Sequence, residues 1–156
     1  MDNIHFSMES NEWETPQELY DELNKEYGFT LDPCATKKSA KCDKYYTKED
    51  DGLSKDWSGE IVFMNPPYGR EIPKWIKKAS ETRSAVVVCL IPSRTDTKYW
   101  HNYIFKSAHK VMFIKGRLKF KGNQKGSGSA PFPSAIVVFD KMACGGSYIG
   151  AYEPQV

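Results

Sequence analysis

The chain of 156 residues lacks the features that identify membrane and secreted proteins. Its longest apolar run covers only residues 85–91, far short of the ~20 residues that a membrane span needs. The N-terminus has no basic segment followed by an apolar stretch, so we expect no secretory signal. These absences predict a protein of the cytoplasm that has no membrane partner.

Metal-binding patterns are also missing. The four cysteines contain no C-x-x-C pair, and the three histidines do not cluster with them. Zinc sites in proteins use a closer ligand spacing. We therefore expect neither a metal site nor a disulfide. Cys89 lies inside the apolar run and is expected to be a small buried hydrophobe.

The chain has little excess charge of either sign, because its 22 basic and 20 acidic residues give a net charge of only +2. This balance excludes a polybasic coat but not a local basic face. Residues 98–125 carry eight Lys or Arg and no Asp or Glu, which suits either contact with phosphates or a solvated face. With 40% hydrophobic residues, the length and composition predict one globular domain, residues 1–156.

The first helix has clear start and stop signals. Thr15, Pro16 and Glu18 form a capping-box pattern with proline at the first helical position. Gly28 then predicts the end of the helix. Other segments follow the periodicities of strands and helices. We expect strands at 29–32, 61–64, 85–91, 110–114 and 135–140, a short strand at 118–120, and helices at 73–82 and 97–107.

Alternating strands and helices with continuous apolar strands predict an α/β sandwich. We expect a mainly parallel central sheet with an antiparallel edge. Ligands of such sheets collect beyond the carboxyl ends of the strands, which here means after residues 31, 64 and 91.

Asn65, Pro66, Pro67 and Tyr68 directly follow one of these buried strands. Two consecutive prolines often do no more than end a strand, because each removes a backbone donor and fixes φ. An amide before the pair and an aromatic ring after it favour a second interpretation, which is methylation of a planar exocyclic or amide nitrogen.

The lone pair of such a nitrogen is delocalised, so it is a poor nucleophile. Two acceptors aimed at its N–H bonds, the Asn65 side-chain oxygen and the Pro66 carbonyl, would localise that lone pair, and Pro67 would restrict the backbone that aims the carbonyl. Tyr68 offers a face on which a planar base stacks. A sulfonium methyl donor is already an activated electrophile, so this chemistry requires no metal.

Further motifs lie in a consistent order along the chain, and together they cover nearly all of it. They are residues 13–16, 31–35, 45–57, 65–69, 91–97, 116–120 and 131–134. In these motifs the chain resembles the phage-type DNA N6-adenine methyltransferases, a Dam-like family. The resemblance implies a compact Rossmann-like methyltransferase sandwich with no separate target-recognition domain. It also implies S-adenosylmethionine as methyl donor and an adenine flipped out of duplex DNA as acceptor.

The resemblance assigns residues to the donor site. Asp32 corresponds to the acid near the amino group of the donor, and Pro33, Cys34 and Ala35 form the turn after it. Thr15 and Pro16 match the motif that closes over the methionine part, and Asp51 the residue that reads the adenine amine.

The chain departs from the usual pattern in this region. No G-x-G loop follows the first strand, and the segment between that strand and the catalytic one is abbreviated, which leaves Glu49 and Asp50 as weak candidates for the ribose contact.

Five residues are candidates for DNA contact, namely Arg94, Asp96, Arg117, Lys121 and Lys125. Arg94 and Asp96 equally suit a helix entry, and residues 122–133 suit a plain hairpin connection. A monomer or weak dimer is expected.

Two other functions stay open. The same motif can methylate an RNA adenine or a protein glutamine, and the aromatic content of 13% also suits a non-catalytic single-strand binder.

Overall fold

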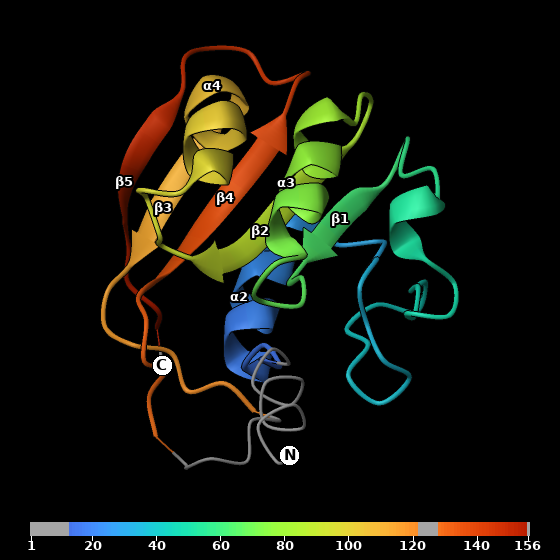
Figure 1. Ribbon diagram of the computed structural model, residues 1–156, viewed down its shortest axis with the longest axis horizontal. Helices are drawn as coiled ribbons and strands as arrows, with labels where there is room; N and C mark the ends of the chain where they lie inside the picture. Colours follow the sequence, from blue (N-terminus) through green and yellow to red (C-terminus); the bar gives the residue numbers. More distant parts are fainter. Residues whose placement is uncertain (1–12, 122–127, 156) are drawn as a thin grey trace.

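A five-stranded sheet in the order β1-β2-β4-β3-β5 forms the centre of the molecule (Figure 1). The computed structural model describes residues 13–121 and 128–155. The strands are β1 (Ile61–Met64), β2 (Val86–Pro92), β3 (Lys110–Ile114), β4 (Ser134–Asp140) and β5 (Tyr148–Tyr152). The helical elements are α2 (Gln17–Tyr27), η1 (Gly52–Ser54), α3 (Ile72–Glu81), the π-helical turn η2 (Trp100–Ile104) and α4 (Phe105–Ser107).

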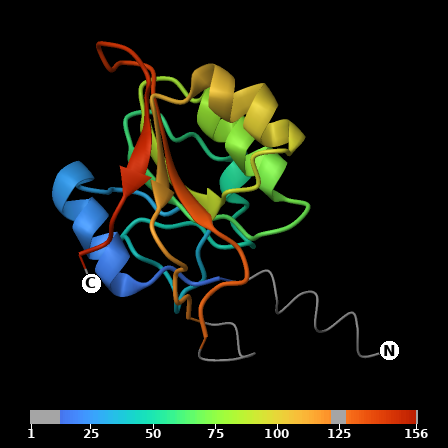
Figure 2. The same cartoon turned by 90° about the vertical axis from the view of Figure 1, so that its left-hand side faces the viewer.

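Helices cover both faces of the sheet. Figure 2 shows α2 on one face and α3 with η2 and α4 on the other. Alternate strand residues supply the two cores, so that Phe63 packs with Leu19 and Leu23 of α2 while Met64 packs with the α3 side. Within the described ranges, no helix combines the length and the hydropathy needed to cross a bilayer.

The sheet confirms the expected α/β class and its mainly parallel strands. β1 pairs with β2 and β3 pairs with β5 in parallel, whereas β4 is antiparallel to both of its neighbours. The expected antiparallel edge is therefore wrong, because the single reversed strand lies inside the sheet. β4 is buried at every position except its last, and it pairs along one edge with β2 and along the other with β3.

The start of α2 differs from the expected capping box. Pro16, with an extended ψ of 132°, is the N-cap, and no side chain caps the helix. The expected stop is confirmed, since Gly28 adopts the left-handed conformation and its N–H donates to the Asn24 carbonyl at 2.9 Å.

Three other segments differ from their expected form. Residues 29–32 extend the sheet beside β1 only through isolated bridges such as Leu31–Val62. Residues 118–120 form no strand, although the Leu118 carbonyl accepts from the Ala130 N–H at 2.8 Å. β5 has no counterpart among the predicted strands.

Candidate active site

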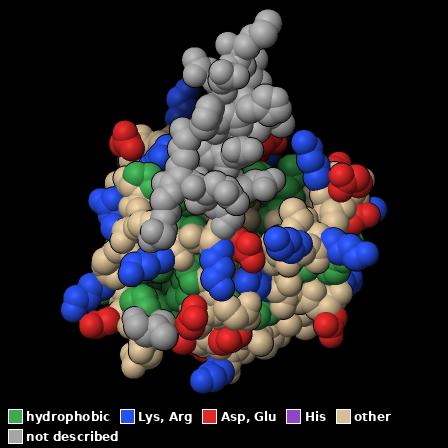
Figure 3. All heavy atoms as spheres, turned by 90° about the horizontal axis from the view of Figure 1, so that it is seen from below, with side chains coloured by type: hydrophobic (Ala, Val, Ile, Leu, Met, Phe, Trp, Pro, Cys, Tyr) green, Lys and Arg blue, Asp and Glu red, His purple; other side chains and the backbone are tan. Residues whose placement is uncertain are grey.

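The carboxyl ends of the parallel segments meet at one edge of the molecule. The Leu31–Val62 bridge and the β1–β2 register place Asp32, Asn65 and Ser93 just beyond neighbouring ends. Figure 3 looks at the molecule from below and shows basic and acidic side chains interleaved on the visible surface. The strand pairing thus brings the expected polar residues to one edge.

Asp32 is a buried carboxylate, only 5% exposed. One of its oxygens accepts the Lys41 backbone N–H at 3.1 Å, and the Cys34 backbone N–H also donates to it. Burial nevertheless raises the pKa of Asp32 to about 6. No ion pair among the described residues uses this carboxylate, so a cationic ligand would supply the missing partner.

The turn after Asp32 lies directly against η1. A Cβ on Gly52 would collide with the Pro33 carbonyl and lie 3.3 Å from the Trp75 ring, so this approach requires glycine. Asp51, at the N-terminus of η1, has a left-handed φ of 55° and an exposed side chain. Asp51 directly precedes Gly52, so the contact of Gly52 with Pro33 brings it near the Asp32 turn.

The rest of the turn is held by neighbouring backbone and by burial. Ala35 is buried, and its N–H donates to the Tyr46 carbonyl at 2.9 Å. Burial and the nearby Asp32 carboxylate raise the pKa of the Cys34 thiol well above its usual range, against a hydrogen bond from the Asn65 backbone N–H. This hydrogen bond joins the turn directly to Asn65.

The Asn65 side chain has one end fixed and one end free. Its Nδ2 donates to the Trp13 carbonyl and to the Thr15 Oγ1, the latter at 2.9 Å. Its Oδ1 is buried and has no hydrogen-bond partner in the described part of the chain. Because the Trp13 carbonyl can only accept, the nitrogen must face it, and the oxygen is left as an unused acceptor. Pro66 is buried and Pro67 is partly buried after it.

Tyr68 contributes its ring to a cavity of about 430 Å³. The ring is 5% exposed, its hydroxyl donates to the Leu90 carbonyl at 3.1 Å, and burial raises the pKa of that hydroxyl well above its usual range. Its edge packs against Phe132 at 5.5 Å between ring centroids. Trp13, Phe132 and Arg94 line the same cavity, with the Arg94 guanidinium 5.8 Å from the Phe132 centroid. A volume of this size lies within the range of small-ligand pockets.

The candidate DNA-contact residues are placed differently from one another. Arg94 lines the cavity, whereas Asp96 is exposed and is not among the lining residues. Arg117 is exposed and its guanidinium donates to the Ala130 carbonyl at 3.3 Å. Lys121 is exposed and pairs through its backbone with Glu14. Lys125 lies outside the described residues.

Asp50 and Glu49, the two weak candidates for the ribose contact, have different surroundings. The Asp50 carboxylate is already used locally, because it accepts the Thr47 backbone N–H at 2.9 Å and the Thr47 hydroxyl at 3.0 Å. These hydrogen bonds lower the pKa of Asp50. Glu49 is exposed.

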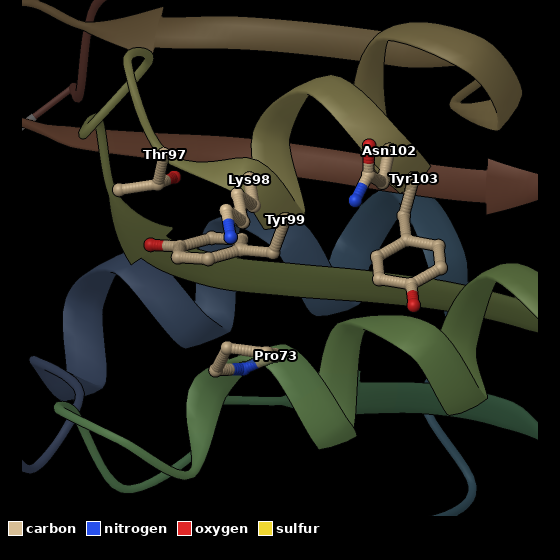
Figure 4. A pocket seen from close by; sticks show the side chains of 6 residues that line it. All are labelled: Pro73, Thr97, Lys98, Tyr99, Asn102 and Tyr103. Atoms are coloured by element: carbon tan, nitrogen blue, oxygen red, sulfur yellow. The ribbon is translucent and has the colours of Figure 1, made fainter.

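Sequence reasoning missed part of the cavity lining. Trp57 is fully buried, whereas Trp13 is partly buried, packs against the core and lines the cavity. A second cavity of about 400 Å³ adjoins the first and shares Thr97 and Tyr99 with it. Figure 4 shows the Tyr99 hydroxyl pointing away from Tyr103 toward the Thr97 end. In the sequence, only the motifs at residues 13–16 and 131–134 pointed to part of this cavity lining.

Comparisons with known proteins agree on one family. The model of the family described as "DNA N-6-adenine-methyltransferase (Dam)" matches residues 5–149. The DNA N-6-adenine-methyltransferase of Haemophilus phage HP1 (strain HP1c1) is 28% identical over 147 residues, which cover 90% of this chain and 84% of that protein. The protein of the same name from Escherichia phage T1 is 30% identical over 110 residues, which cover 68% of this chain and 45% of that protein.

One solved structure shows a partial likeness. A Listeria monocytogenes protein described as a class I S-adenosylmethionine-dependent methyltransferase aligns with a TM-score of 0.45 and 12% identity. The alignment covers 72% of this chain and 42% of that one.

Proposed function

The chain belongs to the DNA N-6-adenine-methyltransferase (Dam) family, and we propose that it methylates adenine N6 in DNA at the edge formed by Asp32, Asn65 and Tyr68. The single observation that carries this assignment is the buried Asn65 Oδ1, an acceptor without a partner at a strand end. Burying a polar atom without a hydrogen bond is costly, so we expect a ligand to donate a hydrogen bond to this oxygen.

The acceptor nitrogen would meet two oxygens. The Asn65 Oδ1 and the Pro66 carbonyl each accept one N6 hydrogen, which localises the nitrogen lone pair and directs it away from the ring plane. Pro67 limits the conformations of the Pro66 backbone and so holds its carbonyl in place. Tyr68 and the aromatic cavity beside it stack the base.

The methyl donor that fits the other half of the edge is S-adenosylmethionine, which supplies a methyl group bound to a positively charged sulfur. The chemistry of the site agrees with this donor, because the buried Asp32 carboxylate lacks a cationic partner and suits an ammonium group. The surrounding turn of Pro33, Cys34 and Ala35 would enclose the amino-acid end.

Two further residues complete the proposed donor site. Asp51 would receive the adenine amine of the donor, since the next residue, Gly52, packs against Pro33 of that turn. Pro16 would close over the methionine part. The expected place of Thr15 on the donor side stays a prediction, and its hydroxyl contacts Asn65.

The substrate is duplex DNA with one adenine flipped into the cavity, a step that costs a few kcal/mol of unstacking. Arg94 in the cavity and the exposed Arg117 and Lys121 are proposed to contact the DNA, with Lys125 and Asp96 as weaker candidates. We also propose that the protein acts as a monomer or weak dimer in the cytoplasm of a bacterial host.

The test incubates the full chain with methyl-labelled S-adenosylmethionine and equal amounts of duplex DNA, RNA and protein. The expected result is label in DNA alone, recovered as N6-methyladenine. Label in RNA or in protein glutamine would favour the alternative methyltransferases. Nucleic-acid binding without any methyl transfer would favour the single-strand binder.

A further inference from the structure

We propose that Thr15 is a positioning residue that holds the Asn65 amide in the orientation that the Trp13 carbonyl selects. This inference rests on the proposed function of Asn65. An asparagine amide has two ends of similar size, and only the oxygen end can accept a hydrogen from the substrate nitrogen. If the amide were rotated, its NH₂ group would face the NH₂ group of the adenine. Neither group could accept a hydrogen bond, and methyl transfer would be lost.

The contact that carries the proposal joins residues 50 positions apart. The Thr15 Oγ1 lies 2.9 Å from the Asn65 Nδ2, and the Thr15 side chain is only 3% exposed. The Trp13 carbonyl accepts the second hydrogen of the same Nδ2. With both hydrogens held, the Asn65 Oδ1 is the end that faces away, and it is the end that has no partner.

The segment that carries Thr15 is itself fixed on two sides. The Glu14 N–H donates to the Lys121 carbonyl at 2.9 Å, and the Lys121 N–H donates back at 3.0 Å. The Trp13 ring packs edge-on against Phe120 at 5.6 Å and Phe132 at 5.1 Å between centroids. A hydroxyl held this way restrains the neighbouring amide, because it has little freedom to move with it.

The start of α2 supplies an independent observation. A threonine before Pro16 and Glu18 ordinarily caps a helix, yet α2 begins without a side-chain cap. The Thr15 hydroxyl contacts Asn65 instead. A residue that departs from a local sequence preference, such as helix capping, often has a functional role instead. Here the Thr15 hydroxyl contacts the proposed catalytic amide.

The experiment compares Thr15→Val, which keeps the shape and loses the hydroxyl, with Thr15→Ser, which keeps the hydroxyl. We expect Thr15→Val to lower kcat for DNA methylation about tenfold or more while the Kd for S-adenosylmethionine stays within about twofold. Thr15→Ser should retain most activity. In an Asn65→Ala background, Thr15→Val should have no further effect, because the residue acts through that amide.

A second readout needs no activity. The side-chain NH₂ resonances of Asn65 can be identified by their loss in Asn65→Ala, and they should shift and exchange faster with solvent in Thr15→Val but not in Thr15→Ser. If wild-type protein fails to methylate DNA, the proposed function is wrong, and this measurement still decides the Thr15 contact. Should Thr15→Val not fold, Thr15→Ala also removes the hydroxyl and leaves only a small cavity.

Three results would overturn the proposal. One is a Thr15→Val variant with wild-type kcat. Another is a large rise in donor Kd with kcat unchanged, which would place Thr15 in the donor site. The third is an Asn65 NH₂ signal identical in wild type and Thr15→Val.

Discussion

Replacing Asp32 by asparagine should make the protein more stable at neutral pH and a poorer binder of the methyl donor. The substitution keeps the shape and an oxygen that can accept the Lys41 N–H, and it removes only the charge. Burial raises the pKa of Asp32 from 3.8 to about 6, so the folded protein holds the proton more tightly than the unfolded chain does.

The sign and size of the stability effect follow from this pKa. Between about pH 4 and pH 6 the folded state binds more protons than the unfolded state, so wild-type stability falls as the pH rises through that window. Above pH 6 the cost of the buried charge is fully present, at about 3 kcal/mol taking 1.36 kcal/mol per pKa unit. Asp32→Asn escapes this cost and should melt about 5–10 °C higher at pH 7.5.

The assay is thermal and urea unfolding of both proteins at pH 4 and pH 7.5 without donor, followed by calorimetric titration with S-adenosylmethionine. We expect nearly equal stabilities at pH 4, a clear gain for Asp32→Asn at pH 7.5, and a donor Kd raised about 10–100-fold. Equal stability at pH 7.5, or an equal difference at both pH values, would refute the argument from burial. An unchanged donor Kd would refute the donor-site assignment.

Three other substitutions test the site. Asn65→Ala should lower methyl transfer at least about 100-fold and leave the donor Kd within about threefold, measured by labelled transfer and calorimetry; a parallel loss of donor affinity would contradict its role toward the acceptor. Gly52→Ala should weaken donor binding and lower the melting temperature, because its Cβ collides with the Pro33 carbonyl, whereas Gly146→Ala, with open space around it, serves as a neutral control. Tyr68→Phe should lose about 1 kcal/mol of stability with the hydrogen bond to Leu90 and keep methylation within about fivefold; an inactive variant would show that the hydroxyl and not the ring is required.

Residues with strong local signals were predicted well. The apolar runs that became β1 and β2, and the Gly28 stop of α2, depend on side-chain character and backbone freedom that are visible within a few positions. The place of Asn65 at a carboxyl strand end followed from the same runs. The sequence thus predicted which edge of the sheet carries the polar residues.

Features that depend on distant partners were not predictable in this way. Thr15 looks like a helix cap locally, and only the approach of Asn65 from the sheet redirects its hydroxyl. The interior place of β4 depends on strand order, which no local pattern encodes. β5 was missed because its exposed residues, including Ile149 at 63%, lack the buried alternation of a strand.

The central claim is that the free oxygen of Asn65 activates an adenine amine in DNA. Mass spectrometry of nucleosides from duplex DNA, incubated with S-adenosylmethionine and either wild type or Asn65→Ala, tests it most directly. We expect N6-methyldeoxyadenosine from the wild type and almost none from the variant, although both bind the donor. Equal N6-methyladenine from the two proteins, or methylation of cytosine instead, would contradict it.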